Sequence, residues 1–275
     1  MTLKKLFAAL VFICPLLLWG AFYAPLLLSE FEWEKSSKVW LVSEKLDGVR
    51  GIWDGEKMYF RSGKEMRLPP SFTKDFPPFA LDGEIYSPHK NFSQILSILK
   101  NQERFDEIMQ LQYFVFDVPF AKGGLQERLE SLKNYLAHTP QDFIVIIPQE
   151  SLSSEDSIKQ KLQQITRNGG EGIVLRNPHT PYESGRSKNA FKLKIAQDAE
   201  CTIKDYTQGK GRYEGMIGAL ICQYEDKTFK IGSGLNLAQR QNPPPIGSLI
   251  TFKYYGLTHK GIPRFPIFWR VKESE

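Results

Sequence analysis

Short strand-like segments separated by glycine and proline run through most of this chain, and they limit its fold more than any other feature. KVWLVSEK, VRGIWDG, KMYFRSG and FALDGEIYS follow one another closely, and LQYFVFDVP and FIVIIPQ come later. Three stretches instead have apolar residues three or four positions apart, which predicts helices over 92–100, 125–138 and 158–168. This mixture predicts an α+β fold built on antiparallel sheets.

The pattern changes near residue 196. From there on, ECTIKDYTQG, IGALICQYED, KTFKIGSG, GSLITFKYYG and PRFPIFWRVK are strand candidates joined by glycine- and proline-rich turns. A short run of strands of this kind suits a small barrel of the oligonucleotide-binding (OB) type. We therefore expect an α+β domain over 29–195 and an OB-fold domain over 196–275.

The first 28 residues form a separate segment. Lys4 and Lys5 precede an uncharged apolar run from Leu6 to Leu28. This order of charge and hydrophobicity predicts a secretory signal peptide or a membrane anchor over 1–28, and hence a periplasmic or exported protein. No small-x-small cleavage site is evident, so cleavage and anchoring both remain open.

The cysteines and the net charge add two weaker indications. Cys201 and Cys222 lie in the second domain, and two buried thiols on neighbouring strands are the simpler expectation, with a disulfide as the alternative in an oxidising compartment. The formal net charge of +5 suits a polyanionic partner if the basic residues gather on one face.

The segment EKLDGVR is the first candidate for chemistry. A lysine nucleophile must lose its proton, so it needs nearby cations, a metal or burial to favour the neutral amine. Arg50 supplies a cation near Lys45, Asp47 can help to position the site, and Gly48 permits a close approach of the backbone. Alone, the pattern Lys-x-Asp-Gly at 45–48 could equally belong to a turn at the end of a strand.

Further blocks along the chain carry residue types that bind nucleotides. Basic residues can hold phosphate or ribose, an aromatic ring can stack on a base, and carboxylates can hold a divalent metal. In chain order these residues are Arg61 and Lys64, Glu84, Phe116, Glu171 and Arg176, and then Lys192 and Lys194 on one strand face. Each has a plain structural alternative: the acids as solvated strand ends, Phe116 as core, and the paired lysines as an exposed face.

Taken together, the ordered blocks KLDG, RSG, DGE, FD, EGIVLR and KLK resemble the collinear motifs of the covalent nucleotidyltransferases. That superfamily includes ATP-dependent DNA ligases, RNA ligases and mRNA capping enzymes. EGIVLR, FKLK and a following barrel are similar to DNA ligases. The ending GIPRFPIFWRVK resembles minimal bacterial ligases that carry a leader peptide, the Lig E type. The resemblance extends from about residue 39 to 272.

The resemblance implies a nucleotidyltransferase (adenylation) domain and a reaction. Lys45 would attack the α-phosphate of ATP and form lysyl-AMP, with Lys192 and Lys194 neutralising that phosphate. The AMP would pass to the 5′-phosphate of a nick in duplex DNA, and the 3′-hydroxyl would then expel it. The implied nucleotide site also includes Glu44, Arg50, Arg61, Glu84 and Phe116, with Phe116 on the adenine. Glu84 and Glu171 would hold Mg²⁺ or Mn²⁺.

Contacts with DNA are less defined in the sequence. The terminal motif of the family is matched only loosely, and Arg264, Arg270 and Lys272 are its candidates. Phosphate contacts are also expected from Arg176, Lys210, Arg212, Lys253 and Lys260, although these side chains suit solvated surface positions equally well. The alternatives are an RNA ligase or capping-type nucleotidyltransferase, and a non-catalytic nucleic-acid-binding protein. We expect a monomer.

Overall fold

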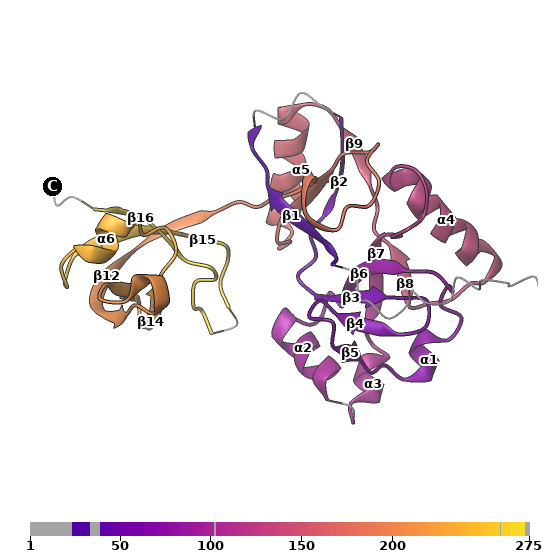
Figure 1. The fold of residues 1–275 in the computed structure, drawn as a ribbon, viewed down its shortest axis with the longest axis horizontal. Helices are drawn as coiled ribbons and strands as arrows, with labels where there is room; N and C mark the ends of the chain where they lie inside the picture. The colour runs from indigo at the N-terminus through magenta and orange to yellow at the C-terminus, as the bar shows by residue number, and fades with distance from the viewer. Residues whose placement is uncertain (1–23, 34–38, 102, 259, 273–275) are drawn as a thin grey trace, which may run out of the picture.

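The computed structural model describes residues 24–33, 39–101, 103–258 and 260–272, which form two domains joined by a single strand (Figure 1). Most of the predicted leader, residues 1–23, lies outside the described part of the chain. Within that part, no helix combines the length and hydrophobicity needed to span a membrane.

The first domain contains two sheets. One has the strand order β1-β11-β10-β2-β9, and its only parallel pair is β1 with β11. Its apolar side packs on helix α5, where Ile158 and Leu162 contact Trp40 and Phe191 in one core cluster. The bounds of these elements are β1 (Leu26–Glu30), β2 (Trp40–Glu44), β9 (Glu150–Leu152), α5 (Glu155–Arg167), β10 (Ile173–Arg176) and β11 (Gly185–Leu193).

The other sheet has the order β5-β4-β3-β6-β7-β8 and is largely antiparallel. Four helices contribute to its core, which includes the fully buried Phe72, Ile95 and Leu132. Its elements are β3 (Val49–Trp53), β4 (Met58–Phe60), β5 (Glu65–Met66), α1 (Pro70–Thr73), β6 (Leu81–Tyr86), α2 (Phe92–Lys100), α3 (Phe105–Ile108), β7 (Gln112–Asp117), α4 (Leu125–His138) and β8 (Ile144–Ile146).

Two of the longer helices, α2 and α5, begin at side-chain caps, whereas α4 follows Gly124 without one. Asn91 caps α2 through a capping box with Gln94, and the side chain of Ser154 accepts a hydrogen bond from the Ser157 amide at the start of α5. Helices α2 and α4 have the bounds predicted from apolar spacing. The prediction for α5 was three residues late at its start, because its first turn is polar and only its cap marks it.

The second domain is a five-stranded sheet with the order β14-β13-β12-β15-β16. A bridge between Ser233 and Ile267 brings its two edges together, which closes a small barrel around Phe252 and Ile231. The predicted OB fold is therefore confirmed. Its elements are β12 (Gln197–Gln208), the 3₁₀ turn η2 (Gly211–Tyr213), β13 (Ile217–Tyr224), β14 (Lys227–Ile231), α6 (Leu237–Gln241), β15 (Leu249–Tyr254) and β16 (Ile267–Val271).

Two findings differ from the expectations. Cys201 and Cys222 are buried on neighbouring strands as expected, but they form a disulfide rather than two free thiols. Residues 24–28 were assigned to the leader, yet Leu26, Leu27 and Leu28 belong to strand β1 of the folded domain. An apolar run is compatible with a leader or with a strand. These residues form a strand because they pair with the distant β11.

Candidate functional site

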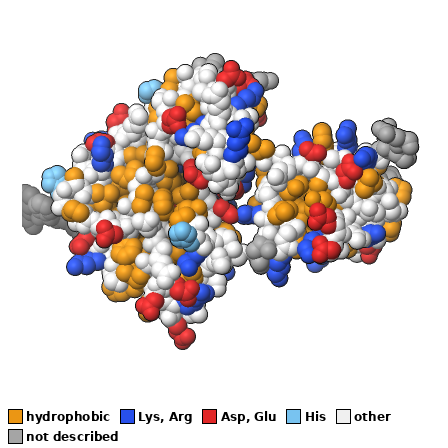
Figure 2. Space-filling model, turned by 180° about the vertical axis from the view of Figure 1, so that it is seen from behind, with side chains coloured by type: hydrophobic (Ala, Val, Ile, Leu, Met, Phe, Trp, Pro, Cys, Tyr) orange, Lys and Arg blue, Asp and Glu red, His pale blue; other side chains and the backbone are white. Residues whose placement is uncertain are grey.

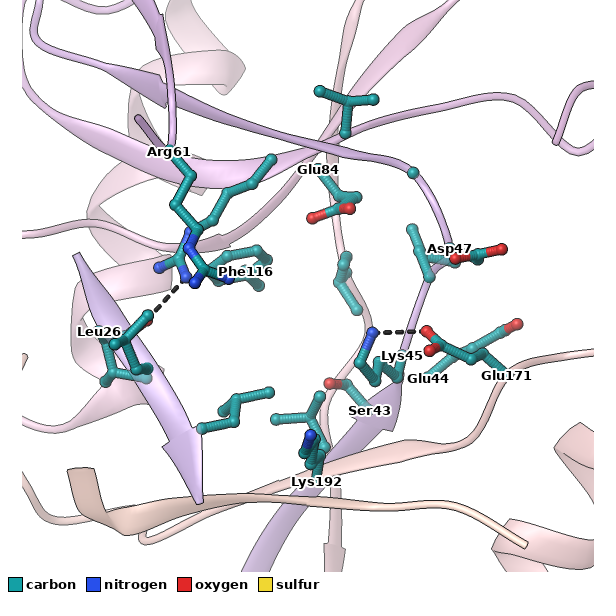
Figure 3. A pocket seen from close by; sticks show the side chains of 18 of the residues that line it. Leu26, Ser43, Glu44, Lys45, Asp47, Arg61, Glu84, Phe116, Glu171 and Lys192 are labelled. Carbon is teal, nitrogen blue, oxygen red and sulfur yellow. Dashed lines mark hydrogen bonds and ion pairs between the residues drawn. The ribbon is translucent and has the colours of Figure 1, made fainter. Parts of the chain in front are cut away.

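A cavity of about 650 Å³ opens between the two sheets of the first domain, which is a size typical of ligand pockets (Figure 3). Residues from both sheets line it, and Arg264 and Phe265 of the second domain contribute to its rim. The predicted nucleotide-site residues all line this cavity: Glu44, Lys45, Arg50, Arg61, Glu84, Phe116, Glu171, Lys192 and Lys194.

Lys45 lies directly after β2, where its backbone N–H donates to the carbonyl of Gly172 at 2.9 Å. Its Nζ lies 2.5 Å from Glu171 Oε2, and the other oxygen of that carboxylate pairs with Lys194 (Figure 3). Glu171 therefore holds two ammonium groups side by side in the cavity. The neutral amine is the nucleophilic form of lysine, so an attack by Lys45 would require its contact with Glu171 to break.

Gly48 has a role other than the one expected. A Cβ at this position would lie 2.4 Å from the backbone oxygen of Ile85, so only glycine fits. The close approach is thus to the neighbouring strand β6, and it brings the loop that carries Lys45 against the sheet that carries Glu84.

Arg50 is fixed by a buried acid that the sequence analysis did not single out. Its Nε and Nη2 donate to the two oxygens of Asp82 at 2.8 and 2.5 Å, and Asp82 is fully buried. Burial alone would lower the pKa of Arg50, but the Asp82 carboxylate outweighs it and raises the pKa above its ordinary value. Arg50 is therefore a permanent cation in the cavity wall. Asp82 is the first acidic residue of the block LDGEIY, so the sequence did contain a signal from which a partner for Arg50 could have been proposed.

Two guanidinium groups contact the Phe116 ring, that of Arg50 at 5.3 Å and that of Arg176 at 5.4 Å from the ring centroid. Arg176 is 6% exposed and pairs with the buried Asp117, which also holds Arg128 at 2.7 Å. Arg176 is thus held by an acid inside the domain while it also lines the cavity, and its contact with DNA stays a prediction. Its position indicates that it orients Phe116 in the cavity.

Glu84 projects into the cavity from β6, and its carboxylate accepts no hydrogen bond from any residue that the structure describes (Figure 3). Burial raises the pKa of Glu84 to about 8, against the influence of Lys45 and Arg50, and Glu171 adds to the rise. In the described residues, no group of three or more His, Cys, Asp or Glu side chains could enclose a metal. Glu84 and Glu171 are a pair whose oxygens suit a hard cation that other ligands complete.

The raised pKa of Glu84 predicts a pH-dependent stability. A carboxyl that binds its proton more tightly in the folded protein makes the free energy of unfolding fall as pH rises from 4.5 to about 8. We expect Glu84→Gln to flatten the slope in this window, as measured by urea unfolding at several pH values. Glu56→Gln, on an exposed turn of the same domain, is the control. An unchanged slope in Glu84→Gln would show that Glu84 titrates alike in both states.

An ion pair joins the second domain to the rim of the cavity. Arg264 donates to both oxygens of Asp47, at 2.6 and 3.0 Å, and Asp47 is two residues from Lys45. In the space-filling view the domains touch over a narrow region, with basic side chains spread over both (Figure 2). Of the other residues expected at DNA, Lys210, Arg212, Lys260 and Arg270 are exposed on the second domain, and Lys253 packs 4.3 Å from the ring of Trp269. Their DNA contacts remain predictions.

Comparison with known proteins assigns both domains. Residues 29–194 match the family of the ATP dependent DNA ligase domain, and residues 208–272 match the DNA ligase OB-like domain. A DNA ligase of Haemophilus influenzae is 47% identical over 234 residues, which cover 85% of this chain and 87% of the relative. A DNA ligase of African swine fever virus is 30% identical over 211 residues, covering 68% and 49%.

Solved structures agree with this assignment. One from a study of Lig E DNA ligases and their minimal DNA-binding scaffold has a TM-score of 0.85 at 33% identity, over 92% of this chain and 100% of the other. Chlorella virus DNA ligase-adenylate has a TM-score of 0.54 at 26% identity, over 93% and 100%. These relatives are DNA ligases, so an RNA ligase or a non-catalytic binding protein is not favoured. The chain belongs to the ATP-dependent DNA ligases.

Proposed function

We propose that this DNA ligase seals nicks in duplex DNA with Lys45 as the residue that carries AMP. The observation that supports this most strongly is the pairing of Lys45 and Lys194 on the single carboxylate of Glu171 inside the cavity. Attack by the neutral Lys45 amine on the α-phosphate of ATP would form a nitrogen–phosphorus bond. The bond from that phosphorus to pyrophosphate would break, and pyrophosphate would leave with the electron pair.

The other cavity residues fit the charges of this reaction. Phosphoryl transfer is accelerated mainly by positioning and by neutralising the phosphate oxygens. Lys192 lies on β11, Lys194 directly follows that strand, and both border the cavity with Lys45, so we assign them to the α-phosphate. Phe116 offers a ring face to the adenine, and Arg61, on the exposed turn after β4, is assigned to the ribose.

We also propose that the reaction uses Mg²⁺ or Mn²⁺. The residues fit such an ion, because the Glu84 carboxylate accepts no hydrogen bond from the described residues and lies near enough to Glu171 for that acid to raise the pKa of Glu84. A bound divalent cation would neutralise the triphosphate and relieve this repulsion. The chain's own residues would hold the ion from two sides of the cavity wall, with Glu84 on β6 and Glu171 in the loop before β10.

Labelling with ATP tests the assignment of Lys45. Incubation with α-labelled ATP and Mg²⁺ should transfer label to the protein, and unlabelled nicked DNA should then discharge it. Label that is transferred from ATP but stays on the protein when nicked DNA is added would argue against ligation as the function of this site.

The Asp47–Arg264 ion pair predicts a loss in the first step alone. We expect Arg264→Ala to slow lysyl-AMP formation by about tenfold or more, because a bidentate charge-assisted contact at the cavity rim is lost. Sealing of a nick that already carries AMP should change little. Lys230→Ala, at an exposed lysine of β14 in the same domain, is the control for the loss of one positive charge. Equal losses in both assays would contradict a role confined to the first step, because sealing of a nick that already carries AMP does not need lysyl-AMP formation.

We propose that the enzyme works outside the cytoplasm as a monomer. The order of Lys4, Lys5 and the apolar run favours export, and the Cys201–Cys222 disulfide suits an oxidising compartment. Both domains that border the cavity come from one chain, which favours a monomer. Cell fractionation combined with alkylation of free thiols tests this: protein in the periplasmic or secreted fraction with both cysteines blocked is expected. Reduced, cytoplasmic protein would contradict it.

A further inference from the structure

Strand β1 forms part of the wall of the nucleotide cavity, although it contains none of the sequence motifs. It pairs in parallel with β11, with Leu26 opposite Gly185 and Glu30 opposite Lys192. Leu26, Leu27 and Leu28 line the cavity, and Leu26 is only 5% exposed. The strand is also the first described element, and it contains the last leucines of the apolar run of the sequence.

A closed ring of hydrogen bonds ties β1 to Arg50. The Leu26 N–H donates to the Tyr182 hydroxyl at 2.9 Å, and this hydroxyl donates to Asp82 Oδ2 at 2.7 Å. Asp82 accepts from Arg50, and Arg50 Nη1 donates back to the Leu26 carbonyl at 2.7 Å. The ring joins one sheet to the other, because Leu26 and Arg50 belong to different sheets.

The ring fixes the direction of the Arg50 guanidinium. Arginine has five N–H groups in one plane, and the bonds to Asp82 and Leu26 occupy three of them. The others remain for a ligand in the cavity, and the Phe116 ring lies against the same group. A strand that served only to cover the edge of the sheet would need its pairing with β11 and no contact with Arg50.

We propose that β1, held in place by the Tyr182 hydroxyl, positions Arg50 for the phosphate of the bound nucleotide. This inference rests on the proposed function of the cavity. Tyr182 is then a positioning residue, and β1 belongs to the working enzyme. The Gly185 amide donates to the Pro25 carbonyl at 3.2 Å, so any processing of the N-terminal segment must cut before Pro25.

A double-mutant cycle in the full-length chain tests the positioning role. Tyr182→Phe removes only the hydroxyl and should slow lysyl-AMP formation by roughly tenfold, because a hydrogen bond to a charged network is lost. In an Arg50→Lys background, which cannot make the fork to Asp82, the same change should slow the reaction less than about twofold. Tyr135→Phe is the matched control, since the Tyr135 hydroxyl contacts the backbone at 3.4 Å and does not line the cavity.

The possible results distinguish a positioning role of Tyr182 from a purely structural one. A slowdown that is alike in both backgrounds, or no slowdown at all, would overturn the role of Tyr182. The mass of the N-terminal peptide of active enzyme from its source cells is a second measurement that needs no substitution. A first residue at or before Pro25 is expected, and active enzyme that begins at residue 26 or later would overturn the proposal. Absence of label in the unchanged protein would refute the proposed function instead.

Discussion

Replacement of Lys45 by alanine is expected to reduce nick sealing by at least about a thousandfold, because the substitution removes the nucleophile itself. The fold should survive. Lys45 lies at the cavity with its side chain 24% exposed, and Glu171 keeps Lys194 as a partner. Sealing of labelled nicked DNA with ATP measures the loss, and the melting temperature checks the fold.

Lys188→Ala provides the matched control, because Lys188 is an exposed lysine on β11 that does not line the cavity. Its sealing rate should equal that of the unchanged enzyme. An alanine variant of Lys45 that still seals within tenfold of the control would mean that AMP is carried by another residue, and the assignment of the whole cavity would have to be revised.

Asp117→Ala is expected to cause the largest loss of stability, about 3–5 kcal/mol in the free energy of unfolding. Asp117 is fully buried and pairs with Arg128 and Arg176, so alanine would leave two buried guanidinium groups without their carboxylate. Burial alone would raise the pKa of Asp117, but the two arginines lower it below its usual value. The acid is therefore ionised in the folded protein. Urea unfolding at neutral pH measures the loss.

An exposed ion pair gives the comparison for Asp117. Asp226 pairs with Lys227 on a turn of the second domain and is 74% exposed, so Asp226→Ala should lower the free energy of unfolding far less than Asp117→Ala does. A similar small loss in Asp117→Ala would mean that water enters the domain and solvates both arginines. Adenylation should fall as well in Asp117→Ala, because Arg176 would no longer be held against Phe116.

The sequence predicted the elements whose signals are local. Helices α2 and α4 follow from apolar residues on one face, and the five strands of the second domain follow from their separation by glycine and proline. The short helices α1 and α3 were missed, because four residues cannot show a helical period. Strand β1 was missed because its leucines continue an apolar run, and only pairing with β11 distinguishes a strand there.

The site divides in the same way. The residues that line the cavity could be chosen because ordered motifs name them, from Lys45 to Lys194. The long-range contacts that hold these residues in place could not be predicted. Tyr182 reaches Asp82 across 100 positions of sequence, and Arg264 reaches Asp47 across 217. Arg176 combines both kinds of residue, since its motif placed it at the cavity and only the structure shows its ion pair with the buried Asp117.

We expect a single amine in this cavity, that of Lys45, to carry AMP between ATP and DNA. Intact-mass spectrometry after incubation with ATP and Mg²⁺, followed by peptide mapping, tests it most directly. One adenylyl group on the peptide that contains Lys45 is predicted, and it should disappear when nicked DNA is added. An unmodified mass after exposure to ample ATP, or an adduct on any other residue, would contradict the account.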